Sequence, residues 1–380
     1  MEIYLDNNAT TPVDERVLEE MLPYFTRKYG NAASRSHAYG WTAAEAVENA
    51  REKVARLLNC EPGEIIFNSG ATEGINLALK GVFENYQAKG NHIITVATEH
   101  KAVLDTCRAL EQKGADITYL PVNRDGQIDL AQLEQSIRKN TILICVMYAN
   151  NETGVIQDIA AIGDFASRHG IMFMSDVTQA MGKIPVDMQQ LKIDIAPLSA
   201  HKFYGPKGVG ALFVRRRGPR VTLAPQMDGG GHEKGLRSGT LNVPGIVGLG
   251  KAVELVINEL EQDEMRVRNL RDQLQQALLG MHGVVLNGSL KHRTPNTLNV
   301  SFTGLTIPTI LAPLCKTVAV SSGSACTSAL MEPSYVLKAM GIDDDTAYAS
   351  IRFSLGRFTT AEEINYVIER VREIVLELKL

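Results

Sequence analysis

Residues 141–175 read TILICVMYANNETGVIQDIAAIGDFASRHGIMFMS, and this stretch decides the fold class. It contains two short apolar runs, Thr141–Tyr148 and Ile171–Ser175, which are typical of buried strands. Between them, the apolar residues of Ile159–His169 recur with helical spacing. Strands that alternate with helices in this way indicate an α/β domain, in which helices cover a mostly parallel sheet.

The same alternation extends from about residue 60 to about residue 215. The other expected strands are Glu64–Asn68, His92–Ala97, Asp116–Leu120, Asp194–Ser199 and Gly210–Val214, with helices at Ala71–Phe83 and Lys101–Lys113. Together these segments predict a mostly parallel sheet of seven strands. Ligands of such sheets bind at the carboxyl ends of the strands, so polar residues that directly follow a strand are candidates for a site.

A second pattern begins after a long charged helical stretch at about Ile246–Leu279. The expected strands there are Val284–Asn287, Thr297–Phe302 and Ala347–Leu355, with helices near Ile307–Cys315, Ser334–Met340 and Ala361–Leu380. These elements predict a smaller α+β domain. We expect residues 15–255 to form the large domain, and residues 1–14 with 256–380 to form the small one.

Composition excludes several classes of protein. The chain has 380 residues, of which 44% are hydrophobic and 22% charged, and its net charge of -4 gives no electrostatic footprint for nucleic acid or an anionic membrane. Its start has no basic or apolar leader, and we expect a cytoplasmic protein without membrane attachment. The five cysteines are scattered and form no Cys-x-x-Cys motif, so neither a disulfide framework nor a metal site is expected.

One cysteine lies on a run of small polar residues, Ser321–Ala329. A structural cysteine is usually surrounded by apolar residues, so Cys326 is interpreted as an exposed nucleophile. The alternative is an incidental loop cysteine.

Three segments of the large domain place reactive side chains after strands. Ser69–Gly74 opens a helix and is a candidate phosphate cradle through its backbone N–H groups and the Thr72 hydroxyl, or else an ordinary helix start. Asp176 follows the strand Ile171–Ser175, where it meets a ligand or forms a turn. Ser199–Gly208 brings together a hydroxyl, an imidazole and an amine, from Ser199, His201 and Lys202. A lysine and an acid are what pyridoxal phosphate needs to act as an electron sink, while the competing Lys207 is expected to face water.

Strand periodicity singles out Arg352. Ile351, Phe353 and Leu355 form one apolar face, whereas Ser350, Arg352 and Ser354 occupy the other, so the guanidinium points away from the small-domain core. It faces either the cleft, where it would match a carboxylate, or solvent.

Eight blocks of sequence, in order along nearly the whole chain, carry a family resemblance. They are Leu5–Pro12, Ser69–Glu73, Thr98–His100, Asn150–Gly154, Asp176–Gln179, Ser199–Lys202, Arg237–Thr240 and Ser321–Ser328. Together they resemble the pyridoxal-phosphate-dependent cysteine desulfurases, the group that includes the NifS and IscS proteins. The resemblance implies the aspartate-aminotransferase-like fold, known as fold type I.

The resemblance also implies roles for individual residues, which fall into cofactor, substrate and sulfur chemistry. On the cofactor ring, Lys202 would bind pyridoxal 5'-phosphate covalently and move protons, Asp176 would pair with the pyridine nitrogen, Gln179 and Asn151 would address the ring hydroxyl, and His100 would stack on the ring and transfer protons. The phosphate would be bound by Ala71, Thr72, Ser199 and His201, and Thr240 would complete that site from a second subunit. The substrate carboxylate would be held by Arg352 with Asn151. Residue types alone leave Arg237–Thr240 as a surface loop, so the homodimer is implied by the resemblance only.

The implied reaction converts L-cysteine to L-alanine and leaves a persulfide on Cys326 for a sulfur-acceptor or iron-sulfur scaffold protein. Ala32 departs from the family pattern as a loop change, and the segment Thr303–Pro308 departs from it in the small domain, so the resemblance does not fix the local geometry there. The given sequence ends at Leu380 without the extra segment with which IscS-type members dock a scaffold, so the resemblance implies no particular acceptor. The alternatives are a lyase for selenocysteine or cysteine sulfinate, an aminotransferase that does not need Cys326, and a non-catalytic sulfur-carrier or assembly subunit.

Overall fold

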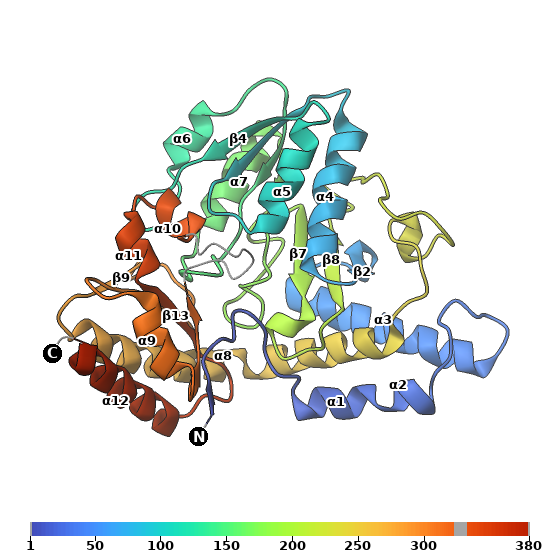
Figure 1. Ribbon diagram of the computed structural model, residues 1–380. Helices are drawn as coiled ribbons and strands as arrows, with labels where there is room; N and C mark the ends of the chain where they lie inside the picture. The colour runs from blue at the N-terminus through green and yellow to red at the C-terminus, as the bar shows by residue number, and fades with distance from the viewer. Residues whose placement is uncertain (1, 323–332, 379–380) are drawn as a thin grey trace.

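A seven-stranded sheet forms the centre of the larger part of the computed structural model, which describes residues 2–322 and 333–378 (Figure 1). The strands are β2 (Ile65–Asn68), β3 (His92–Val96), β4 (Asp116–Leu120), β5 (Thr141–Cys145), β6 (Met172–Met174), β7 (Ile195–Ser199) and β8 (Gly210–Val214). Their spatial order is β2-β8-β7-β6-β5-β3-β4, and only β8 runs antiparallel to its neighbours. The prediction of a mostly parallel seven-stranded sheet is confirmed.

Helices cover both faces of this sheet because side chains alternate along its strands. In β5, Ile144 points to one core, whereas Leu143 and Cys145 point to the other. The helices of this part are α1 (Glu15–Met21), α2 (Pro23–Thr26), α3 (Ala38–Leu58), α4 (Ala71–Tyr86), α5 (Lys101–Glu111), α6 (Leu130–Gln135) and α7 (Ile159–His169). Apolar residues of α3 and α7 fill the first core and those of α4 and α5 fill the second, which gives three layers.

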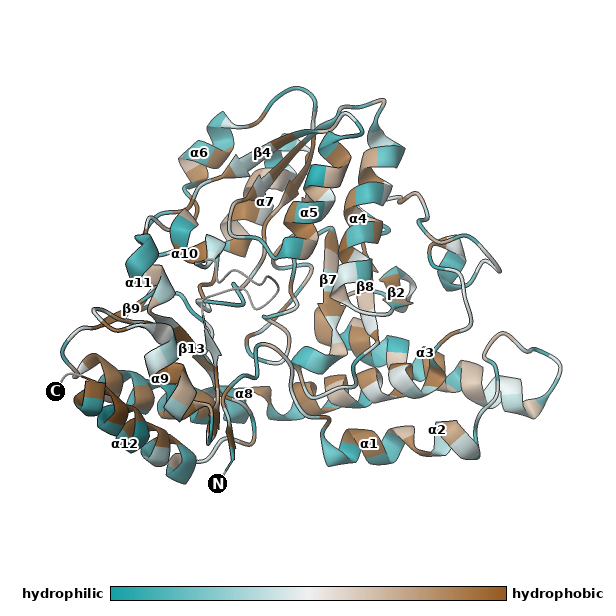
Figure 2. Cartoon of the chain, in the orientation of Figure 1, coloured by the Kyte–Doolittle hydropathy of each residue, from teal (hydrophilic) through white to brown (hydrophobic). Residues whose placement is uncertain are grey.

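A second, smaller part is built on an antiparallel sheet with the order β12-β13-β10-β9. Its strands are β9 (Val284–Leu286), β10 (Thr297–Phe302), β12 (Ser321–Ser322) and β13 (Ser350–Ser354), and a separate parallel pair joins β1 (Ile3–Tyr4) to β11 (Val318–Ala319). The helices are α9 (Ile307–Leu314), α10 (Tyr335–Ala339), α11 (Asp344–Tyr348) and α12 (Ala361–Leu378). The apolar stripe of α12 faces this sheet, as the brown inner surfaces in Figure 2 show.

One long helix, α8 (Val243–Leu279), runs beneath both parts (Figure 1). Its first half, up to Val256, packs into the core of the large sheet, and its second half, from Val267 to Leu278, packs into the core of the small sheet. Ile3 and Leu5 from the N-terminus also lie in that second core. The division into domains 15–255 and 1–14 with 256–380 stays a prediction.

The expected strand Ala347–Leu355 was wrong in its first residues. Asp343 caps a short helix there, because its side chain accepts a hydrogen bond from the amide of Thr346 at 2.9 Å, so Ala347 and Tyr348 end α11. None of the helices in the described ranges is both long and apolar enough to cross a membrane. Residues 2–322 and 333–378 also contain no group of three His, Cys, Asp or Glu side chains arranged to hold a metal ion.

Candidate active site

A cavity of about 660 Å³ lies at the carboxyl ends of the parallel strands. Its walls come from segments that directly follow β2, β3, β5, β6 and β7, and from two distant segments, the N-terminal residues 8–10 and β13. The predicted residues that line it are Ala71, Thr72, His100, Asn151, Asp176, Gln179, Ser199, His201, Lys202 and Arg352. The structure therefore brings together residues that are up to 281 positions apart in the chain, from Ala71 to Arg352.

Lys202 enters the cavity from a single 3₁₀ turn, Ala200–Lys202, that follows the end of β7. Its amine donates to the backbone carbonyls of Asn8 at 2.6 Å and Ala9 at 2.8 Å. Burial, and then the nearby Arg352, lowers the pKa of Lys202 to about 8, although Asp176 and Asp6 oppose the shift. A substantial fraction of this amine is neutral near physiological pH, as a nucleophilic lysine requires.

Asp176 and Gln179 lie on the turn that follows β6. The Asp176 side chain is 5% exposed, and its Oδ1 accepts a hydrogen bond from the backbone of Thr178 at 2.9 Å. In the described part of the chain it forms no ion pair with a lysine or arginine. Gln179 donates through Nε2 to the carbonyl of Asn8 at 2.9 Å. A buried carboxylate without a cationic partner suits a ligand that brings its own positive charge.

The N-terminus of α4 forms one end of the cavity. Its N-cap is Gly70, which leaves the first turn without a side-chain cap, so the amides of Ala71 and Thr72 have no competing acceptor there. Gly70 has φ 145°, and a Cβ at this position would lie 3.3 Å from the hydroxyl oxygen of Ser199. The dipole of this helix and its free amides favour an anion, with the hydroxyls of Thr72 and Ser199 beside it.

His201 belongs to the same end of the cavity. Burial, followed by the charges of Lys202, Lys207 and Lys183, lowers the pKa of His201 to about 4, so the ring is neutral at physiological pH. Its Nδ1 lies 3.1 Å from the hydroxyl of Thr10. A neutral imidazole can still donate one hydrogen bond to an anion.

His100 lies at the rim, between this cavity and a neighbouring one of about 810 Å³. It caps α5, because its Nδ1 accepts a hydrogen bond from the amide of Ala102 at 3.1 Å. The pKa of His100 is lowered by burial first, with Asp176 opposing and Lys202 adding to the shift. With Nδ1 used as an acceptor, the neutral ring carries its proton on Nε2.

Arg352 is buried on β13 and lines the cavity, so of the two orientations that the strand pattern left open the structure has the one toward the cleft. Its guanidinium pairs with Asp6 at 2.6 Å and donates to the carbonyl of Asn151 at 2.9 Å. The Nε–H of Arg352 and the side-chain oxygen of Asn151 are buried without a hydrogen-bond partner in the part of the chain that the structure describes. Both residues therefore retain hydrogen-bonding capacity that a polar ligand can use.

One predicted site residue is not brought into this cavity, and another lies where the structure gives no description. Thr240 lies outside it, on a segment tied to α4 by an ion pair of 2.8 Å between Arg237 and Glu73. Cys326 lies outside the described residues. The residues that flank its segment on both sides, Ser321 and Ser334 among them, line the neighbouring cavity that shares His100, Asn151 and Arg352 with the first one.

The downstream flank is tied to the site by two hydrogen bonds. The hydroxyl of Ser334 donates to the carboxylate of Glu152, and Tyr335 donates to the backbone carbonyl of Glu99 at 2.7 Å. Glu152 and Glu99 are direct neighbours of Asn151 and His100. Ser334 and Tyr335 are thus anchored beside the candidate cavity.

The sequence interpretation missed the roles of Asp6, Asn8 and Ala9. These residues belong to the block Leu5–Pro12, which contributed to the resemblance but received no role. Asp6 pairs with Arg352, and the carbonyls of Asn8 and Ala9 accept from Lys202. Backbone acceptors leave no side-chain signal in a sequence, so only the presence of the polar run Leu5–Pro12 in the resemblance could have pointed to them. Lys207 is exposed, as expected, but it also lines the cavity.

The cavity fits pyridoxal phosphate by the chemistry of its side chains. It offers an amine of lowered pKa in Lys202, an unpaired carboxylate in Asp176, and an uncapped helix N-terminus at Gly70 for a phosphate. The orphaned polar atoms of Asn151 and Arg352 come from the segment after β5 and from β13 of the small sheet.

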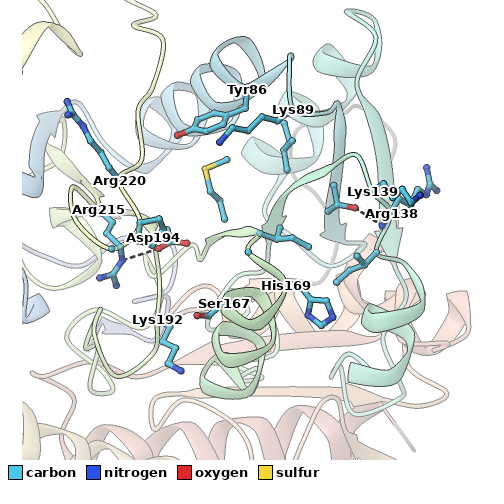
Figure 3. Close-up of a pocket in the computed structure, with 18 of the residues that line it drawn as sticks. Tyr86, Lys89, Arg138, Lys139, Ser167, His169, Lys192, Asp194, Arg215 and Arg220 are labelled. Atoms are coloured by element: carbon cyan, nitrogen blue, oxygen red, sulfur yellow. Dashed lines mark hydrogen bonds and ion pairs between the residues drawn. The ribbon is translucent and has the colours of Figure 1, made fainter.

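A further cavity of about 770 Å³ lies at the opposite edge of the sheet, at the amino ends of β5 and β6 (Figure 3). Its rim includes Lys192, Arg215 and Asp194. Size alone therefore does not distinguish the candidate site, but the chemistry of the lining does.

Comparisons with known proteins identify the family of this chain. The model of the aminotransferase class-V family matches residues 3–367. The curated cysteine desulfurase IscS of Anaeromyxobacter dehalogenans is 56% identical over 378 residues, which cover 99% of this chain and 93% of that protein. The protein of the same name from Escherichia coli is 54% identical over 379 residues, with 99% and 93% coverage.

Solved structures give the same picture. A structure named as a NifS-like protein superposes with a TM-score of 0.93 at 41% identity, covering 99% of this chain and all of the other. Another, described as SspA in complex with cysteine, has a TM-score of 0.82 at 37% identity, covering 94% of this chain and 100% of that one. On its sequence, its fold and the make-up of its cavity, this chain belongs to the aminotransferase class-V family, alongside the curated IscS proteins.

Proposed function

We propose that this chain is a pyridoxal-phosphate-dependent cysteine desulfurase, which converts L-cysteine to L-alanine and retains the sulfur as a persulfide on Cys326. The observation that carries this conclusion is the convergence of Lys202, Asp176 and Arg352 on one cavity, in a chain that is 56% identical to a curated cysteine desulfurase. An amine, a carboxylate and a guanidinium are the groups needed to bind the cofactor and an amino acid together.

Separate groups of residues would hold the ring and the phosphate of the cofactor. Lys202 would attach it covalently, and Asp176 would pair with its ring nitrogen. Gln179 and Asn151 would address the ring hydroxyl, and the ring of His100 would stack on the cofactor. The amides and hydroxyls of Ala71, Thr72 and Ser199, together with His201, would bind the phosphate, and Thr240 of a second subunit would complete the phosphate site. When bound, the cofactor supplies an electron sink for the electron pair that remains when the substrate Cα loses its proton.

The substrate would be held by a different set of residues. Arg352, with Asn151 beside it, would bind the α-carboxylate of cysteine through charge-assisted hydrogen bonds. Asp6 fixes one terminal nitrogen of this guanidinium and so sets its orientation. The neutral amine of Lys202 would accept the Cα proton, a role for which a pKa of about 8 is well matched.

Sulfur transfer is assigned to Cys326. Its thiolate would form an S–S bond to the substrate sulfur while the Cβ–S bond of the substrate breaks. The electron pair of the broken bond remains with carbon, which takes up a proton, so the products are alanine and a persulfide. His100, with its Nε2 proton toward the cavity rim, is the group we assign to proton transfer between the thiol and the substrate.

The persulfide would then pass to an acceptor protein, and we infer that iron-sulfur scaffold proteins are among the acceptors. Thr240 lies outside the cavity of its own chain, which supports a homodimer in which each subunit completes the phosphate site of the other. A cytoplasmic location stays a prediction.

The proposal is tested by incubating the purified protein with cysteine, selenocysteine and cysteine sulfinate, and measuring alanine from each. Peptide mass analysis of the cysteine reaction should place one extra sulfur on the peptide with Cys326 and none on those with Cys60, Cys107, Cys145 or Cys315. Borohydride reduction should fix the cofactor to Lys202. Alanine formation that persists at full rate in Cys326→Ala would contradict the proposal, and so would a cofactor fixed to another lysine.

A further inference from the structure

A second lysine, Lys183, lies one helical turn beyond Gln179 and is almost completely buried, with 8% of its surface exposed. Its amine donates to two oxygens of Gln179, the side-chain Oε1 at 2.7 Å and the backbone carbonyl at 3.2 Å. It does not line the main cavity, whereas Gln179 does. Among the residues that line the main cavity, Gln179 is the one to which Lys183 donates hydrogen bonds in the described part of the chain.

This lysine has no carboxylate partner among the described residues, although the other strongly buried cations, such as Arg51 and Arg215, are paired with Glu233 and Asp194. A buried charge without a counterion is strongly unfavourable. Burial, followed by the charges of Lys202 and Arg352, moves the pKa of Lys183 well below its usual value. Two N–H donors for two oxygen acceptors is the hydrogen-bonding capacity of a neutral amine.

The side-chain amide of Gln179 is thereby fixed in one of its two orientations. On one side, the carbonyl of Asn8 can only accept, so the Nε2 group must face it, at 2.9 Å. On the other side, Lys183 supplies N–H groups, so Oε1 must face the lysine. Reversing the amide would place two acceptors against each other at Asn8 and would lose that hydrogen bond, together with the present donation from Lys183 to Oε1.

We propose that Lys183 is a positioning residue, which holds the Gln179 amide with its N–H side toward the cavity, so that the cavity offers a donor there and selects a ligand with an acceptor oxygen. This inference rests on the proposed function, in which that oxygen is the 3-hydroxyl oxygen of pyridoxal phosphate. Lys183 acts through Gln179 and touches neither the cofactor nor the substrate.

The test measures how strongly the cofactor-free protein prefers pyridoxal phosphate over its 3-deoxy analogue. The preference is the dissociation constant of the 3-deoxy analogue divided by that of pyridoxal phosphate. A substitution that weakens the binding of both ligands equally therefore leaves this ratio unchanged. We expect Lys183→Met, which keeps the length of the side chain but has no donor, to reduce the preference about tenfold. Lys183→Gln restores a donor and should keep the preference within about twofold of the unmodified protein. In a Gln179→Ala background, Lys183→Met should have no further effect on the ratio.

Lys207→Met is the matched control, because it replaces another lysine near the same cavity, one that forms no hydrogen bond to Gln179 in the described part of the chain. It should weaken binding of both ligands equally and leave the ratio unchanged. An unchanged ratio in Lys183→Met, or a reduction of equal size in the Gln179→Ala background, would overturn the inference. If Lys183→Met does not fold, Gln179→Ala alone must reduce the preference about tenfold, and an unchanged preference there overturns the inference. An unmodified protein that binds neither ligand overturns the proposed function itself, which is a distinct result.

Discussion

The two edges of the large sheet carry cavities of similar size, about 660 Å³ at the carboxyl ends and about 770 Å³ at the amino ends. They differ in whether the charged side chains described below form ion pairs within the protein. At the amino ends, Arg215 pairs with Asp194 at 3.0 Å and donates to the carbonyls of Met188 and Ile193 (Figure 3). Lys192 on the same rim pairs with Asp164 at 2.6 Å. These cations are satisfied within the protein.

At the carboxyl ends, several groups are left incomplete. Asp176 has no cationic partner, the amine of Lys202 has only neutral acceptors within hydrogen-bonding distance, and buried polar atoms of Asn151 and Arg352 have no partner in the described ranges. Such groups reduce the stability of the folded chain until a ligand meets them. The comparison teaches that unmet polar groups, rather than the size of a hollow, mark the functional edge of this sheet.

The largest effect is expected at the carboxyl edge, from Lys202→Ala. Removal of the amine should lower the rate of alanine formation from cysteine by at least about 10³-fold, because both covalent attachment and proton transfer depend on it. The fold should persist, since Lys202 forms no ion pair within residues 2–322 and 333–378. Steady-state kinetics and circular dichroism measure the two outcomes, and loss of activity through unfolding would contradict the assignment.

At the amino edge, Asp194→Ala is expected to lower stability and to leave activity unchanged. It leaves the buried guanidinium of Arg215 without its carboxylate, so the free energy of unfolding should fall by about 3–5 kcal/mol. The rate of alanine formation per folded molecule should not change. Asp164→Ala is the control, because it breaks the exposed pair with Lys192 and should leave stability nearly unchanged. Denaturant titration measures the free energy of unfolding of both variants. Equal losses of stability in Asp194→Ala and Asp164→Ala would contradict the expected difference between the buried and the exposed ion pair.

Arg352→Lys probes substrate recognition at the carboxyl edge. The lysine keeps the charge but loses the planar fork, so KM for cysteine should rise about 10–100-fold, with a smaller change in kcat. Binding of the cofactor should be unaffected, because Arg352 is assigned to the carboxylate of the substrate. A drop in kcat at unchanged KM would instead place Arg352 in the chemical step.

The smallest of these effects concerns the pH dependence of stability. The pKa of Lys202 is about 8 in the folded cofactor-free protein, below its ordinary value of 10.5, so the unfolded chain keeps this proton to higher pH. The free energy of unfolding should therefore rise with pH between about 8 and 10.5, by at most about 1.4 kcal/mol per pH unit relative to Lys202→Met. Denaturant titrations of both proteins across this range measure the difference. A difference that stays flat would show that the amine is not perturbed by its surroundings.

Much of this architecture could be predicted from the sequence because two signals are local: the apolar runs of the strands and the reactive residues that directly follow them. Buried parallel strands read as apolar runs, and reactive residues directly after them, such as His100, Asp176 and Lys202, therefore had to meet at one edge of the sheet. Strand alternation placed Arg352 opposite the small core in the same way. Asp6 and Asn8 could not be assigned, because their contacts depend on chain segments almost 200 or more residues away. Lys183 carries no local signal either, since its importance comes from burial and from its contact with Gln179.

The helix α8 has a further consequence for how the enzyme moves. Its 37 residues span about 55 Å as one continuous rod, with one half built into each hydrophobic core. Lys202 belongs to the sheet on one half and Arg352 to the sheet on the other. A hinge between these two groups would have to break helical hydrogen bonds or pull a packed core off the rod. The spacing between the amine of Lys202 and the guanidinium of Arg352 is therefore held by the rod on which both cores are built.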